Sequence, residues 1–156
     1  MTRVADATPA SARALIDEGR YMTLGTADAD GAPWATPVWF APVGYHELLW
    51  VSAPEVRHSR NIAARPQVGI VIFDSHVTPG EGQAVYMAAE AAEVTGDAVE
   101  AGMRAFSARS VEQGLAAWTA EQVSGAARLR LYRAVVAEHW MLGERDERVA
   151  VNPQPP

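Results

Sequence analysis

Apolar and polar residues alternate along three short segments in the first third of the chain, and this pattern constrains the fold more than any other feature of the sequence. The segments are 21–27, 34–40 and 47–52. Alternation with a period of two is typical of strands that bury one face. Turn-forming residues at 28–31 and 42–44 separate the segments. The sequence therefore predicts an antiparallel meander of three strands.

Later segments predict more strands. Residues 68–73 form a continuous apolar run, and the longer segments 83–95 and 129–140 also have strand character. Strands and helices do not alternate along the chain, which argues against a doubly wound parallel sheet. The prediction is a mainly β (α+β) fold, an antiparallel barrel of about six strands with peripheral helices.

Helices are expected at the periphery of this barrel. Thr8 and Pro9 provide a cap and a first helical residue for an N-terminal helix. The other expected helices are a short one stopped by Pro66, one over 97–109, and a second helical patch over 111–118.

The chain has 156 residues, which predicts one domain. We divide it into an N-terminal helix (1–20), the barrel domain (21–142) and a C-terminal tail (143–156) whose proline-rich end is expected to fray.

Composition excludes several classes of chemistry. The chain has no cysteine, so a disulfide framework, a zinc–thiolate site and a thiol nucleophile are excluded. All 13 basic residues are arginines, which excludes a Schiff-base lysine and a P-loop. The formal net charge of −6 disfavours nucleic acid and anionic membranes as partners. No apolar run is long enough to span a bilayer, and no signal-peptide pattern is present, so we expect a cytoplasmic protein.

Catalytic and metal-binding motifs are missing. The four histidines, at 46, 58, 76 and 139, have no metal-ligand spacing, so no metal site is expected. No serine lies in a nucleophile elbow. The sequence points to no catalytic side chain.

A basic cluster, Arg57-His58-Ser59-Arg60-Asn61, follows the third strand. Its side chains can donate hydrogen bonds to phosphate oxygens, although such a run is more often a solvated helix face. The five tryptophans leave a similar choice, because they suit either a packed core or an aromatic-walled cofactor site.

The order of these segments resembles the pyridoxamine 5′-phosphate oxidase-like family. The similarity covers residues 20–142 and runs through the first hairpin (24–33), Thr36-Pro37-Val38-Trp39-Phe40, Leu49-Trp50-Val51-Ser52, Arg57-His58-Ser59-Arg60-Asn61-Ile62 and Arg65-Pro66-Gln67-Val68.

The resemblance implies a split β-barrel that binds FMN in a groove at a homodimer interface, with both chains contributing to each site, and that transfers hydride or electrons to or from a small molecule. It further implies a set of cofactor-binding residues: Thr36, Pro37, Val38, Trp39, Val51, Ser52, Arg57, His58, Ser59, Asn61, Gln83, Gln122, Ser124 and Trp140.

The sequence departs from the family pattern in two places. His58 stands where the family usually has a lysine, and the arginine-rich ending of true pyridoxamine phosphate oxidases is not reproduced. We therefore do not expect pyridoxamine phosphate as the substrate. Two alternatives remain open: a reductase that uses the deazaflavin coenzyme F-420, and a non-catalytic flavin-binding protein.

Overall fold

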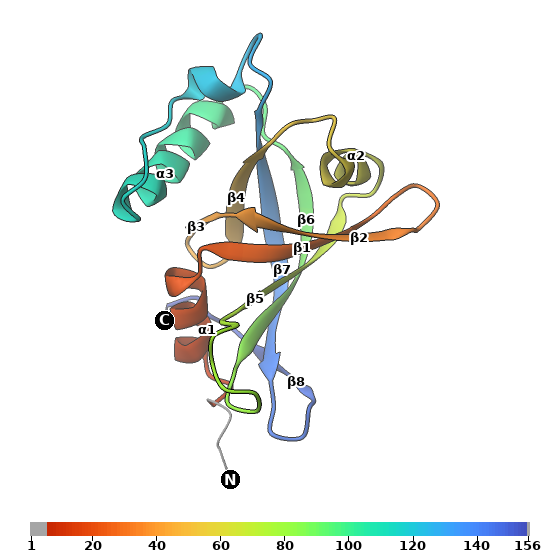
Figure 1. Cartoon of the computed structure of the whole chain (residues 1–156), viewed down its shortest axis with the longest axis vertical. Coiled ribbons are helices and arrows are strands. Elements are labelled where there is room, and N and C mark those ends of the chain that lie inside the picture. Colours follow the sequence, from red (N-terminus) through yellow and green to blue (C-terminus); the bar gives the residue numbers. More distant parts are fainter. Residues whose placement is uncertain (1–5, 156) are drawn as a thin grey trace.

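The computed structural model describes residues 6–155, which form one curled antiparallel sheet with helices around it (Figure 1). The strand order is β2-β1-β5-β6-β7-β4-β3, with β8 paired to β7. The strands are β1 (Tyr21–Ala27), β2 (Pro33–Trp39), β3 (Ala41–Val43), β4 (Glu47–Ser52), β5 (Gln67–Phe73), β6 (Ala84–Glu93), β7 (Arg130–Leu142) and β8 (Arg148–Val151). This sheet confirms the predicted antiparallel split-barrel fold.

The first hairpin forms where its turn residues predict it. The Asp28 carboxylate accepts hydrogen bonds from the backbone N–H groups of Asp30 and Ala32, both at 2.9 Å. Gly31 adopts a φ of 88°, which costs glycine little because it has no Cβ. The turn therefore sets the register that pairs Tyr21 with Trp39 at the far end of the hairpin.

Helices pack on three sides of the sheet (Figure 1). They are α1 (Pro9–Glu18), α2 (Arg57–Ala64), α3 (Ala98–Glu112) and the short 3-10 helix η1 (Ala120–Val123). The Thr8 side chain caps α1 by accepting from the N–H of Ser11, as its sequence predicts. α1 packs against β5 and β6, α2 against β1 and β2, and α3 against β3 and β4. None of the helices in residues 6–155 has the length and apolar composition of a membrane-spanning segment.

The structure differs from the sequence prediction at three short segments. Residues 6–155 contain eight strands rather than six, because β3 and β8 are additional. Each has at most four residues, too few for alternation to reveal a strand. The helical patch expected over 111–118 is absent: α3 ends at Glu112, and Gly114 turns the chain with a φ of 78°.

The C-terminal segment is tied to the barrel rather than free. β8 pairs with β7, and Pro153 is buried with its carbonyl accepting a hydrogen bond from Arg13 at 3.2 Å. The predicted fraying of 152–156 therefore does not hold at Pro153. The ends of the predicted terminal segments, residues 1–5 and 156, lie outside the described residues.

Two apolar clusters hold the molecule together. The first fills the barrel and includes the fully buried Phe40 and Trp50. The second lies on the other face of β4 and β7, where Leu49 and Leu131 pack against Met103 and Phe106 of α3. This second cluster fixes α3 against β3, β4 and β7 and so creates one wall of the cavity described next.

Candidate functional site

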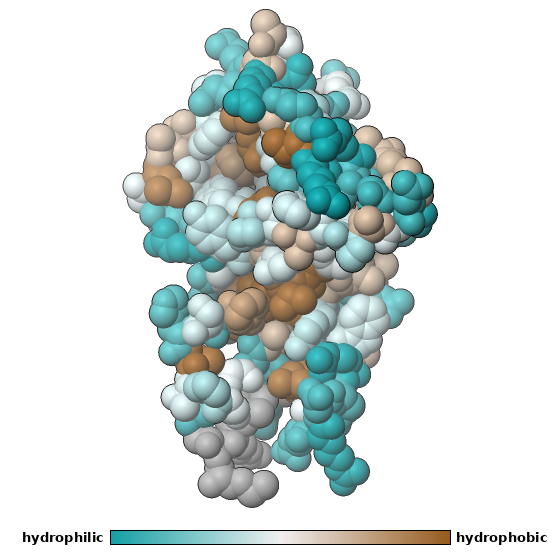
Figure 2. Space-filling view, turned by 45° about the vertical axis from the view of Figure 1, so that its right-hand side comes forward, coloured by the Kyte–Doolittle hydropathy of each residue, from teal (hydrophilic) through white to brown (hydrophobic). Residues whose placement is uncertain are grey.

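A cavity of about 590 Å³ lies between the sheet and α3. The space-filling view shows a hollow with apolar side chains above the β1–β2 hairpin (Figure 2). The lining residues come from β1, β2, β4, α2, α3 and the chain between α3 and β7: Tyr21, Pro37, Val38, Trp39, Val51, Ser52, His58, Phe106, Ser110, Leu115, Ala116, Trp118 and Leu129. Two larger cavities along α3, of about 690 and 860 Å³, contain none of the residues implied by the resemblance.

One wall of the cavity is formed by β2. Among the described residues, β2 pairs with β1 alone, so it is an edge strand with one side of its backbone outside the sheet. Pro37 cannot donate from its nitrogen, which limits pairing with a further strand. The edge therefore offers backbone carbonyls and N–H groups to a ligand.

Aromatic rings form the apolar part of the site. Trp39 meets Phe106 edge to face, with ring centroids 4.9 Å apart, and Phe106 meets Trp118 in the same way at 5.4 Å. The Trp39 Nε1 donates to the Gln113 side chain at 2.8 Å, which fixes the indole ring. These contacts make a stiff aromatic wall that suits a flat ligand.

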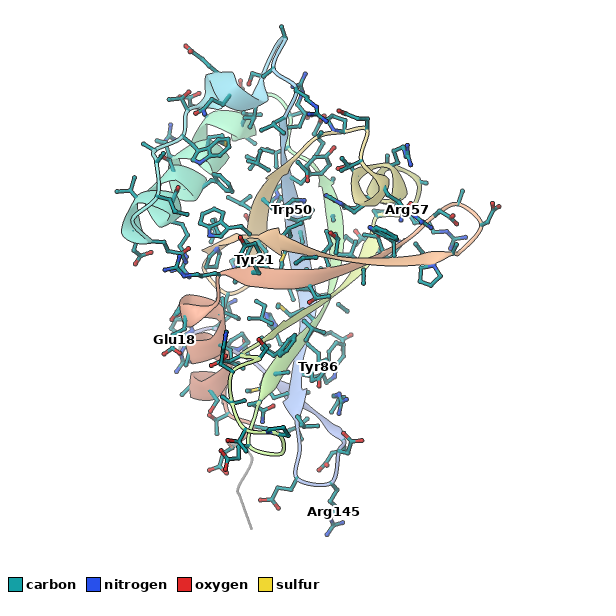
Figure 3. All side chains as sticks on the ribbon, in the orientation of Figure 1. Glu18, Tyr21, Trp50, Arg57, Tyr86 and Arg145 are labelled. Atoms are coloured by element: carbon teal, nitrogen blue, oxygen red, sulfur yellow. The ribbon has the colours of Figure 1, made fainter. Side chains whose placement is uncertain are left out.

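The other end of the cavity adjoins the basic N-terminus of α2. α2 begins at Arg57, and its N-terminus has no side-chain cap and no acidic residue in its first turn. Free N–H groups at a helix N-terminus attract anions. The Arg57 guanidinium lies 4.5 Å from the centre of the Trp34 ring, which holds it beside the hairpin (Figure 3).

His58 lines the cavity next to this helix N-terminus and is half-buried. Its Nε2 is 2.7 Å from the Ser52 hydroxyl. Burial lowers the pKa of His58 below its ordinary value. At neutral pH the imidazole is therefore mostly neutral, and an anion placed beside it would favour the protonated form.

Six of the residues implied by the resemblance share this cavity: Pro37, Val38, Trp39, Val51, Ser52 and His58. Two more adjoin it in the chain, since Thr36 precedes Pro37 on β2 and Arg57 precedes His58 on α2.

Ser59 and Asn61 lie on the buried face of α2 and do not line the cavity. The Asn61 Nδ2 donates to the Thr26 hydroxyl at 3.0 Å, which ties α2 to β1. The Ser59 hydroxyl is buried beside Tyr132 and has no hydrogen-bond partner within the described residues. Within one chain Asn61 therefore helps to position the helix.

Gln122 and Ser124 are exposed and outside the cavity lining, although Trp118 from the same segment lines it. The Gln122 side chain accepts from the N–H of Thr119 at 2.8 Å and so caps η1.

Gln83 and Trp140 lie together in another part of the sheet. The Gln83 amide donates to the carbonyl of Leu142 and accepts from its N–H, both at 2.8 Å. Trp140 pairs with Tyr86 on β6. Neither residue lines the cavity of its own chain.

Sequence reasoning missed the cavity wall that α3 and its following segment provide. Phe106, Ser110 and Leu115 line the cavity, and Tyr21 closes it at the start of β1. Phe106 has helical spacing with Val99 and Met103, which indicates a buried helix face but does not say which strands it covers. Among residues 6–155, no group of three His, Asp or Glu side chains is placed to hold a metal ion.

Comparisons with known proteins agree with this fold. A family model for pyridoxamine 5′-phosphate oxidase matches residues 8–142. No curated protein matches the sequence. Among solved structures, a heme binding protein from Mycobacterium smegmatis has 20% identity and a TM-score of 0.74, covering 97% of this chain, which spans 60% of that protein's length.

Two further structures are similar. The heme storage protein HutZ from Vibrio cholerae has 18% identity and a TM-score of 0.65, with 82% of this chain and 89% of that chain covered. An F420 reductase has 19% identity and a TM-score of 0.59, with 81% of this chain and 94% of that chain covered. At these identities the similarity establishes the shared fold.

Proposed function

This chain belongs to the pyridoxamine 5′-phosphate oxidase family, and on that premise we propose that it is a homodimeric, FMN-dependent oxidoreductase acting on a small molecule. The observation that carries the proposal is the cavity between β2, α2 and α3, in which a stiff aromatic wall lies near the N-terminus of α2: His58 lines the cavity and Arg57 adjoins it. FMN has the same two parts, a flat ring system and a phosphate.

The residues present fit this cofactor. A cavity of about 590 Å³ is within the range of small-molecule and cofactor sites, about 300–1,000 Å³. The ring system would lie along Val38 and Trp39, where the edge of β2 offers backbone hydrogen bonds. The phosphate would lie at the start of α2, where Arg57 and His58 donate to it.

The chain's own residues bind and orient the cofactor. When bound, FMN supplies the hydride or electron transfer, so no protein side chain has to act as a nucleophile. Trp39, held by Gln113, fixes the plane against which the ring packs. Phe106 and Trp118 exclude water from one side of the cavity, and Ser52 orients the His58 imidazole.

A test of activity uses the FMN-loaded protein with a reduced nicotinamide under anaerobic conditions. We expect the yellow flavin absorption to bleach and to return when an electron acceptor is added. Stable binding of FMN whose absorption is not bleached by a reduced nicotinamide would favour the non-catalytic flavin-binding alternative.

The dimer part of the proposal is supported by an apolar sheet face. Neighbouring residues across paired strands point to the same side, which places Val71 of β5 beside Tyr86 of β6 and Tyr86 beside Trp140 of β7. Tyr21 and Phe73 at the ends of this face are 62% and 53% exposed. Figure 2 shows an apolar patch below the hairpin. A second copy covering this face would bring its own Gln83 and Trp140 toward the cavity.

Sedimentation at micromolar concentration tests the dimer. We expect a mass of about twice 16.8 kDa. Phe73→Glu should shift the protein toward the monomer, because a charge buried in the interface lacks a partner. Val77→Glu, which replaces a residue that is 42% exposed in the following loop, is the matched control. A monomeric wild-type protein would contradict the proposal that two chains contribute to each site.

FMN affinity should depend on pH through His58. Its pKa is lowered in the free protein by burial, and the bound phosphate raises it, so binding takes up a proton. Affinity is therefore expected to fall as pH rises from the lowered pKa of the free protein to the higher pKa of the complex.

Dissociation constants measured across neutral pH check this dependence. His58→Lys should bind FMN with little pH dependence in this range, and riboflavin, which has no phosphate, should show none on the wild type. An identical pH profile for wild type and His58→Lys would contradict a role for His58 at the phosphate.

Two other ligands could use the same cavity. The deazaflavin coenzyme F-420 is favoured by the fold shared with an F420 reductase. Heme is favoured by an imidazole, His58, in a mostly apolar cavity and by two structural neighbours described as heme proteins. Absorption spectra after incubation with each ligand separate these candidates, and a heme spectrum that changes in His58→Ala would support the heme candidate.

A further inference from the structure

The wall formed by α3 and residues 113–118 points to the class of substrate. The resemblance assigns cofactor contacts to the sheet side of the cavity, along β2, β4 and α2. The opposite wall carries Phe106, Ser110, Leu115 and Trp118, and a ligand bound against the cofactor would meet these side chains.

This wall carries no charge. Apart from His58 at the phosphate end, no Arg, Asp or Glu of the described chain lines the cavity. The two neighbouring cavities along α3 differ sharply, since Glu100, Arg104 and Glu112 line one and Asp17, Arg109 and Glu112 line the other. Charged residues are thus present around α3 but not on the face that meets the candidate cofactor site.

The hydroxyl of this wall is already engaged, since Ser110 donates to the carbonyl of Ala116 at 2.6 Å. Across the cavity on β2, the Trp39 indole N–H donates to Gln113 at 2.8 Å. An anionic ligand here would lose its hydration without gaining a cationic partner from this wall, which is costly. A flat apolar ligand would instead pack on Phe106 and Trp118.

We propose that the cavity takes an uncharged, planar aromatic substrate between the cofactor and the wall of Phe106, Leu115 and Trp118. This inference rests on the proposed function, because it assumes that FMN occupies the sheet side. It excludes phosphorylated substrates such as pyridoxamine phosphate.

The test measures binding to the oxidised, FMN-loaded protein by tryptophan fluorescence and equilibrium dialysis, without turnover. Three probes are compared: menadione, a naphthoquinone sulfonate and pyridoxamine 5′-phosphate. We expect menadione to bind at least about tenfold more tightly than either charged probe, a difference of about 1.4 kcal/mol.

Leu115 and Val111 provide a matched pair of variants, because they are 49% and 55% exposed and only Leu115 lines the cavity. Leu115→Asp should weaken menadione binding by about tenfold, and Val111→Asp by less than about twofold. Leu115→Arg should improve binding of the sulfonate, since it supplies the missing cation.

Each outcome is informative. A protein that does not load FMN refutes the proposed function itself. A loaded protein that binds a charged probe as tightly as menadione, or whose two aspartate variants behave alike, refutes only the proposed substrate class.

Discussion

Arg57→Ala should weaken FMN binding by about 1.5–3 kcal/mol, or about 10- to 150-fold, because a charged hydrogen bond to the phosphate is lost. Arg57 is exposed at the first position of α2, and its guanidinium lies 4.5 Å from the centre of the Trp34 ring. Losing that contact costs at most about 1 kcal/mol at an exposed site. The variant should therefore fold as the wild type does but bind FMN more weakly.

Arg60→Ala is the control for this experiment. It removes the same charge from an exposed position of the same helix, three residues after Arg57 and so further from the helix N-terminus. Titration calorimetry with FMN and thermal unfolding should be run on both variants. Equal losses of affinity would mean that general positive charge, rather than Arg57, attracts the phosphate.

The second large effect concerns the barrel core. Trp50→Ala should destabilise the fold by about 3–5 kcal/mol, because Trp50 is fully buried and stacks on Tyr132 with ring centroids 5.8 Å apart. Within the described residues its indole N–H has no hydrogen-bond partner. Trp50→Phe should therefore cost much less, since it forfeits packing volume but no hydrogen bond.

Urea unfolding of both variants measures this difference, with Trp34→Ala as a control at a residue that is 41% exposed. A Trp50→Phe variant as unstable as Trp50→Ala would mean that the indole N–H makes a contribution that its geometry does not account for.

The parts of the fold that depend on local pattern could be predicted from the sequence. The 28–31 turn, the strands beside it and α2 before Pro66 follow from neighbouring residues, and the structure contains them. β3 and β8 could not be predicted, because strands this short are stabilised by pairing with β4 and β7 rather than by their own sequence.

The candidate site likewise combines residues that the sequence could place with residues that it could not. Trp39, Ser52 and His58 lie on elements whose order is visible in the sequence, and they meet in one cavity. The position of Phe106 depends on how α3 packs across β4, which is a long-range contact. Asn61 belongs to the basic cluster that the sequence suggests as a phosphate-binding site. In the structure its side-chain Nδ2 instead donates a hydrogen bond to the Thr26 hydroxyl.

The most direct test of the central claim is a fluorescence titration of cofactor-stripped protein with FMN, with riboflavin and the deazaflavin coenzyme in parallel. Trp39 and Trp118 line the cavity, so a bound flavin should quench their emission. We predict saturable quenching at about one FMN per chain, with FMN binding more tightly than riboflavin because of Arg57 and His58. An absence of saturable FMN binding would contradict the account, whichever other ligand the cavity then proved to hold.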